Sequence, residues 1–97
     1  MSRHFETINE NFRRAAEHLS RVAIGSPDAT QVERARVELS RVAGAYRGDG
    51  TEYVPNIITA TDNLARMLQP LSDPAARAAW QEVEEARMMI LDSTRQL

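Results

Sequence analysis

The segment from Phe5 to Val22 reads FETINENFRRAAEHLSRV. Its apolar residues recur at steps of three or four positions, at Phe5, Ile8, Phe12, Ala15, Leu19 and Val22. A period near 3.5 places these side chains in one stripe that can face a neighbouring helix along its whole length. The segment therefore predicts an amphipathic helix over about residues 2–24.

Three further segments repeat this spacing and predict helices over about residues 27–46, 54–69 and 74–95. Their stripes are Val32, Ala35, Leu39, Val42 and Tyr46; Val54, Ile57, Thr61, Leu64, Leu68 and Leu71; and Ala79, Val83, Ala86, Ile90 and Leu97. No segment has the two-residue alternation of a strand. The sequence predicts a single all-α domain, an antiparallel four-helix bundle made of two helical hairpins. We expect the hydroxyl of Thr61 to bond back to the carbonyl four residues earlier.

Residues that favour turns separate the predicted helices. Gly25 is a natural C-terminal cap for the first helix, and Ser26 followed by Pro27 is a strong start signal for the second. Residues 47–51 form a turn-rich link, and Asp73 before a proline repeats the start signal for the fourth helix. The short links within each pair predict hairpins, which can pack up-down-up-down.

The composition restricts the chemistry. The 97 residues contain no cysteine, which excludes disulfides, thiolate metal sites and cysteine catalysis. All twelve basic residues are arginine, which together with abundant alanine indicates GC-rich codon usage and points to a bacterium, phage or plasmid. No apolar run resembles a secretion signal or a membrane span, so we expect a cytoplasmic protein without a membrane partner.

Charge is divided unequally along the chain. Residues 1–47 hold eight arginines against six acids, and residues 48–97 hold four arginines against eight acids. This division suits a head-to-tail or self-complementary contact between proteins. Several arginines have a carboxylate four residues away on the same helix face, as in Glu10–Arg14 and Asp62–Arg66. Because such a carboxylate competes with phosphate for the arginine, we expect no nucleic-acid partner. Weak arginine-based nucleic-acid binding ranks third among the functions.

Two histidines, His4 and His18, lie on the first predicted helix, about 21 Å apart by helical rise. They cannot share a metal ion at that distance, and we predict no metal site and no cofactor. His18 is followed by Arg21 at the third position and Val22 at the fourth. This resembles histidine-phosphotransfer domains, four-helix bundles whose phosphorylated histidine is typically followed by lysine and glycine at these positions. The resemblance makes phosphotransfer through His18 the alternative function, although Val22 departs from the pattern.

The fourth predicted helix carries more apolar residues than its core stripe needs. Trp80, Met88 and Leu91 form a second stripe with Glu84 between them, and Arg87 lies beside Trp80. Tryptophan and methionine are enriched at protein interfaces. We therefore predict these five residues as a partner-binding surface, unless a wide groove between helices takes them into the core.

The expected function is that of a non-enzymatic protein–protein interaction module, such as an adaptor, inhibitor, chaperone or regulator. It would act through this face of the fourth helix on another protein or on a second copy, as a homodimer. We predict no catalytic residue and no small-molecule substrate.

Overall fold

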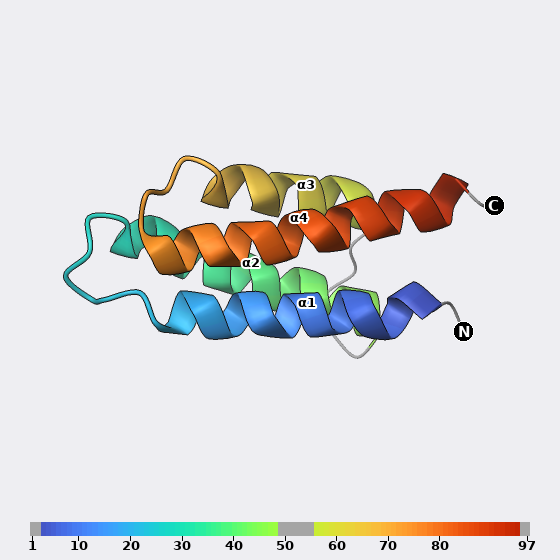
Figure 1. Ribbon diagram of the computed structural model, residues 1–97, viewed down its shortest axis with the longest axis horizontal. Coiled ribbons are helices and arrows are strands. Elements are labelled where there is room, and N and C mark those ends of the chain that lie inside the picture. Colours follow the sequence, from blue (N-terminus) through green and yellow to red (C-terminus); the bar gives the residue numbers. More distant parts are fainter. Residues whose placement is uncertain (1–2, 49–55, 96–97) are drawn as a thin grey trace.

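A computed structural model describes residues 3–48 and 56–95. Its four helices are α1 (Arg3–Ser20), α2 (Ala29–Arg47), α3 (Ile57–Leu68) and α4 (Pro74–Arg95). They alternate in direction, and α4 returns against α1 to close the bundle (Figure 1). The structure thus confirms the antiparallel four-helix bundle built from two hairpins.

The predicted stripes form the core. Each of the four predicted stripes has four buried residues. In chain order they are Ile8, Phe12, Ala15 and Leu19; Val32, Ala35, Leu39 and Val42; Thr61, Leu64, Leu68 and Leu71; and Ala79, Val83, Ala86 and Ile90. The hydroxyl of Thr61 donates to the carbonyl of Ile57 at 2.7 Å, as predicted. This bond satisfies a buried hydroxyl without a partner from another helix.

An aromatic cluster joins α1 to the end of α2. The ring of Tyr46 stacks on Phe5 at a centroid distance of 5.4 Å and meets Phe12 edge-on at 6.0 Å. Burial of the phenol raises the pKa of Tyr46. These contacts place the C-terminal part of α2 firmly against the N-terminal part of α1.

One polar side chain lies in the interface between α1 and α4. Asn11 is 1% exposed, and its amide nitrogen donates to the backbone carbonyl of Glu82 at 3.2 Å and to the carboxylate of Glu85 at 2.9 Å. A buried amide needs such partners because an unpaired one would lose its hydration without compensation. The stripe pattern did not predict that Asn11 is buried.

The end predicted for the first helix is wrong by four residues. The helix ends at Ser20, and the amides of Arg21 and Val22 bond to carbonyls three residues back. Most of a helix's stability in a protein comes from packing. Val22 packs against the core, whereas Ile24 is 98% exposed, so little packing would support a further turn. Gly25 lies outside the helix and does not cap it.

The second helix begins at Ala29, two residues after the predicted start at Pro27. The Ser26 hydroxyl accepts from the amide of Asp28 at 3.2 Å, which builds a turn before the helix. The carboxylate of Asp28 accepts from the amides of Ser72 and Asp73, each at 3.1 Å. Asp28 therefore joins the α1–α2 link to the start of α4.

We expect Asp28→Ala to lower the free energy of unfolding by about 1–2 kcal/mol, since two amides at the start of α4 lose their acceptor. Asp28→Asn keeps an acceptor oxygen and should lose less than half as much. Urea unfolding followed by circular dichroism measures both. Equal stability of the alanine variant and the wild type would contradict the role of this contact.

The other helix ends agree better with prediction. Gly48, with φ of 84°, ends α2 within the predicted turn, and its amide bonds to the carbonyls of Gly44 and Ala45. The Asp73 carboxylate accepts from the amides of Ala75 and Ala76 and caps α4, as predicted. The third helix begins at Ile57 after the cap Asn56, and the earlier start predicted near residue 54 lies outside the described residues.

Candidate functional site

The structure separates the five predicted binding residues of α4. Trp80, Glu84 and Arg87 line a shallow hollow of about 200 Å³ between α3 and α4. Trp80 packs partly against the core, and the guanidinium of Arg77 lies 5.6 Å from its ring centroid. The indole of Trp80 therefore contributes to helix packing, as the alternative interpretation expected when it placed this residue in the core. The accessible part of the side chain lies at the rim of the hollow.

Ion pairs border this hollow on both helices. Arg87 donates to Glu84 at 3.0 and 2.6 Å, and Arg66 lies 3.1 Å from Asp62 on α3. The hydrogen bond from Arg87 holds the pKa of Glu84 below its usual value, and the same bond raises the pKa of Arg87. The two acids and two arginines that line the hollow form these pairs, so the lining itself carries no net charge, and Arg77 adds a positive charge beside Trp80.

Met88 and Leu91 lie outside the hollow. Met88 is 61% exposed on the outer side of α4, Leu91 is half-buried, and Met89 packs against the core on the other flank. The ion pair of Glu84 and Arg87 falls between Trp80 and Leu91 along the helix. The predicted residues therefore form two adjoining surfaces. Trp80, Glu84 and Arg87 belong to the hollow, and Met88 with Leu91 forms an apolar surface beside it.

His18 stands in the last turn of α1, half-buried, and its carbonyl accepts from the amide of Arg21 beyond the helix end. A phosphoryl group at this end would meet the negative pole of the helix dipole, which disfavours an anion. The geometry therefore supports phosphotransfer less well than the spacing alone does. His4 at the other end lies 3.5 Å from Asp92 of α4.

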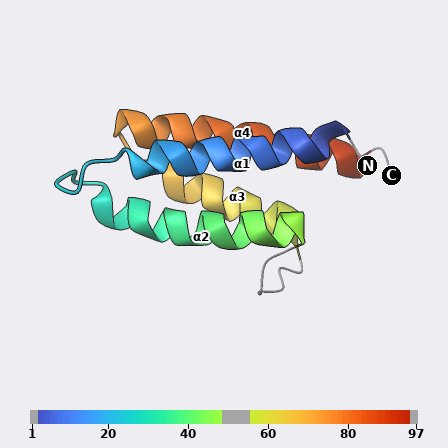
Figure 2. The same cartoon turned by 90° about the horizontal axis from the view of Figure 1, so that it is seen from below.

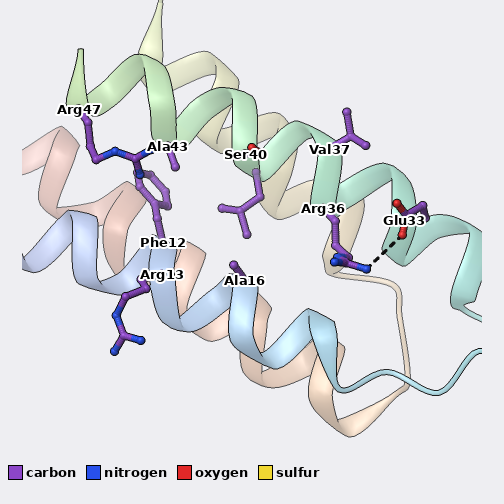
Figure 3. Close-up of a pocket in the computed structure, with 10 residues that line it drawn as sticks. Phe12, Arg13, Ala16, Glu33, Arg36, Val37, Ser40, Ala43 and Arg47 are labelled. Atoms are coloured by element: carbon purple, nitrogen blue, oxygen red, sulfur yellow. Dashed lines mark hydrogen bonds and ion pairs between the residues drawn. The ribbon is translucent and has the colours of Figure 1, made fainter. Parts of the chain in front are cut away.

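A larger hollow lies elsewhere, between α1 and α2. It has a volume of about 480 Å³ (Figure 3) and is lined by Phe12, Arg13, Ala16, Glu33, Arg36, Val37, Leu39, Ser40, Ala43 and Arg47. α1 packs far more extensively on α4 than on α2, and in Figure 2 the α2 ribbon lies farther from α1 than the α4 ribbon does. We call this hollow the α1–α2 groove.

Sequence reasoning missed the α1–α2 groove because it treated each hairpin as closely packed. Two signals were present. Val37 is an apolar residue outside the core stripe of α2, and it is 65% exposed. Ala16 and Ser40 are small, exposed residues beside the stripes of the two helices. Small side chains at such positions leave space between helices when no large residue from the opposite helix fills it.

No protein-family model, curated protein or solved structure matches this chain. The function is therefore inferred from the surfaces of the described residues. Over residues 3–48 and 56–95, no helix is long and apolar enough to cross a membrane. Within the same residues, no three histidine, aspartate or glutamate side chains come together where they could hold a metal ion.

Proposed function

We propose that this chain is a non-enzymatic protein–protein interaction module, of the adaptor, inhibitor, chaperone or regulator kind, that binds through the outer side of α4. The observation that carries the proposal is the exposure of Met88, which is 61% accessible on a helix whose core stripe is already complete. The bundle does not need this side chain for its core, and methionine adapts well to a partner surface.

The neighbours of Met88 extend this surface. Leu91 is half-buried one turn further along α4, and Trp80 lies two turns before Met88 with part of its ring accessible. Glu84 and Arg87 would form a polar rim, which is the usual arrangement around an apolar interface centre. In the homodimeric form, α4 packs on α4 of a second copy.

We expect Met88→Glu to weaken self-association or partner binding at least tenfold, because the interface would bury an unpaired carboxylate. Light scattering over a range of protein concentrations measures the dimer. Asn63→Glu adds the same charge at an exposed position of α3 and should leave association unchanged. A wild type that stays monomeric at all concentrations rules out the homodimer, and equal capture of partners by both variants rules out the α4 surface.

A further inference from the structure

α4 carries a second seam beside the stripe that faces the core. Each of its four members directly follows a core residue of the helix, and they are Trp80, Glu84, Arg87 and Leu91. Their spacing of four, three and four positions places them within about 60° of one another around the helix. All four are half-buried, so α3 and the core leave part of each side chain accessible.

The second seam has the same order of apolar and charged positions in both directions. Its outer members, Trp80 and Leu91, are apolar, and its inner members, Glu84 and Arg87, carry opposite charges. Both pairs are centred between residues 85 and 86. A two-fold axis that crosses α4 at this centre therefore places Trp80 opposite Leu91 of a second copy, and Glu84 opposite its Arg87. Each contact occurs twice, as an isologous interface requires.

α3 carries a pair of charges with the same symmetry. Asp62 and Arg66 lie 3.1 Å apart and line the hollow together with Glu84 and Arg87. α3 runs antiparallel to α4 (Figure 1), and the carboxylate of Asp62 is close enough to interact with the guanidinium of Arg87. The four charges therefore alternate in sign around the hollow. The same two-fold axis brings Asp62 opposite Arg66 of the second copy.

The ion pairs within one chain leave hydrogen-bond donors for a second chain. Arg87 donates to Glu84 through Nε and Nη2, and within the described residues its Nη1 makes no hydrogen bond. Arg66 approaches Asp62 through Nε, and its side chain is 75% exposed. Each guanidinium has more N–H donors than these contacts use, and a carboxylate can accept from more than one donor. A facing copy therefore adds contacts and keeps those already present.

The balance of charge around the hollow also favours a second copy. Two identical surfaces with an excess of one charge repel each other, whereas a surface with alternating charges can attract its own copy. Arg77, beside Trp80, lies about 13 Å from the centre of the seam by helical rise, so its two copies would be about 25 Å apart and screened from each other. Met88 adjoins the seam and is 61% exposed.

We propose that this chain forms a two-fold dimer in which two copies of α4 run antiparallel and the second seam of each packs on that of the other. Glu84 of each chain pairs with Arg87 of the other, and Trp80 packs against Leu91 at both ends. This inference rests on the function proposed above and names the partner of the α4 surface as a second copy of the chain.

The pairing is tested by exchanging the charges at positions 84 and 87. Glu84→Arg and Arg87→Glu each place like charges opposite one another twice, so each should weaken self-association roughly tenfold or more. An equimolar mixture of the two variants should form a heterodimer about as tight as the wild-type dimer, because each arginine then faces a glutamate. The double variant Glu84→Arg, Arg87→Glu should self-associate like the wild type for the same reason. Sedimentation equilibrium measures all four samples.

The control is Glu33→Arg on α2, which makes the same change in charge at a side chain 68% exposed and should leave association unchanged. The double variant retains an ion pair within α4, so it keeps the test decisive where a single variant folds poorly. Circular dichroism shows which variants are folded. A folded double variant that stays monomeric, or folded single variants that stay monomeric when mixed, would overturn the antiparallel pairing.

Trp80 is the only tryptophan of the chain, so its fluorescence reports on the contact. Its emission should move to shorter wavelength as the concentration rises through the range of dimer formation, because Leu91 of the second copy covers the accessible part of the ring. Emission that does not change while the protein dimerises would overturn the proposal. A monomeric wild type would overturn it as well, whereas binding of a different protein is tested separately by partner capture with Met88→Glu.

Discussion

Phe12→Ala is expected to destabilise the protein by about 3–5 kcal/mol. The ring is 1% exposed, meets Tyr46 edge-on at 6.0 Å and forms part of the floor of the α1–α2 groove. Truncation removes its buried apolar surface, leaves a cavity and breaks the aromatic pair. The open groove alongside lets neighbours relax into part of that space, so the lower half of the range is expected.

This loss is large for a domain of 97 residues, whose stability is roughly 5–10 kcal/mol. Urea unfolding followed by circular dichroism measures it. Val37→Ala truncates an apolar residue that is 65% exposed on the same groove and should change stability by less than about 0.5 kcal/mol. A loss below about 1 kcal/mol for Phe12→Ala would mean that the ring is not packed in the core.

Asn11→Asp is expected to cost about 3 kcal/mol at neutral pH. The amide nitrogen of Asn11 donates to the Glu82 carbonyl and the Glu85 carboxylate, and the residue is 1% exposed. Aspartate has nearly the same shape, but it places a carboxylate oxygen where the donor stood. A buried negative charge would then face two acceptors with no donor between them.

The pH dependence of this variant follows from the same contacts. Burial and the nearby Glu85 carboxylate raise the pKa of the introduced carboxyl in the folded state above its unfolded value of about 3.9. The destabilisation is therefore complete above the folded pKa and decreases as the pH falls towards the unfolded value, where the protonated carboxyl can donate again.

Unfolding of Asn11→Asp at neutral pH and at about pH 4.5 tests this prediction. The control is Asn11→Leu, which removes the hydrogen bonds without adding charge and should cost about 1 kcal/mol at both pH values. Equal stability of the two variants at neutral pH would show that the position does not face these acceptors.

Asn11 also illustrates a limit of sequence reasoning. Helical periodicity placed Ile8, Phe12 and Ala15 in the core, because their spacing alone decides which face they share. Asn11 flanks that stripe, and its burial follows from the close approach of α4, which brings Glu82 and Glu85 alongside. No feature of the α1 segment reports how closely a distant helix will pack on its flank.

The links between helices give the same lesson. Ser26 and Pro27 predicted a helix start at residue 27, but α2 begins two residues later. The carboxylate of Asp28 accepts hydrogen bonds from the amides before α4 and none from its own helix. By contrast, Asp73 caps α4 as predicted, since its partners lie two and three residues ahead in the same chain segment. Local capping is readable from sequence, whereas a contact across 44 or 45 positions is not.

The predicted binding residues of α4 were identified from their residue types and spacing. How far each side chain is buried depends on the packing of the neighbouring helices. The surplus apolar residues of α4 were visible in sequence, but only the position of α3 separates half-buried Trp80 from exposed Met88. The α1–α2 groove has no counterpart among the sequence predictions, although Ala16, Val37 and Ser40 were visible as small or misplaced residues.

The amino-acid sequence by itself determined that this protein has four amphipathic helices, which faces they bury and that they alternate in direction, because periodicity, caps and short links act within a few residues. Only the tertiary structure decided that α1 closes tightly on α4 and leaves a groove against α2. The reason is that spacing between helices depends on the summed volumes of side chains from separate segments, and on how fully they fill the space between them.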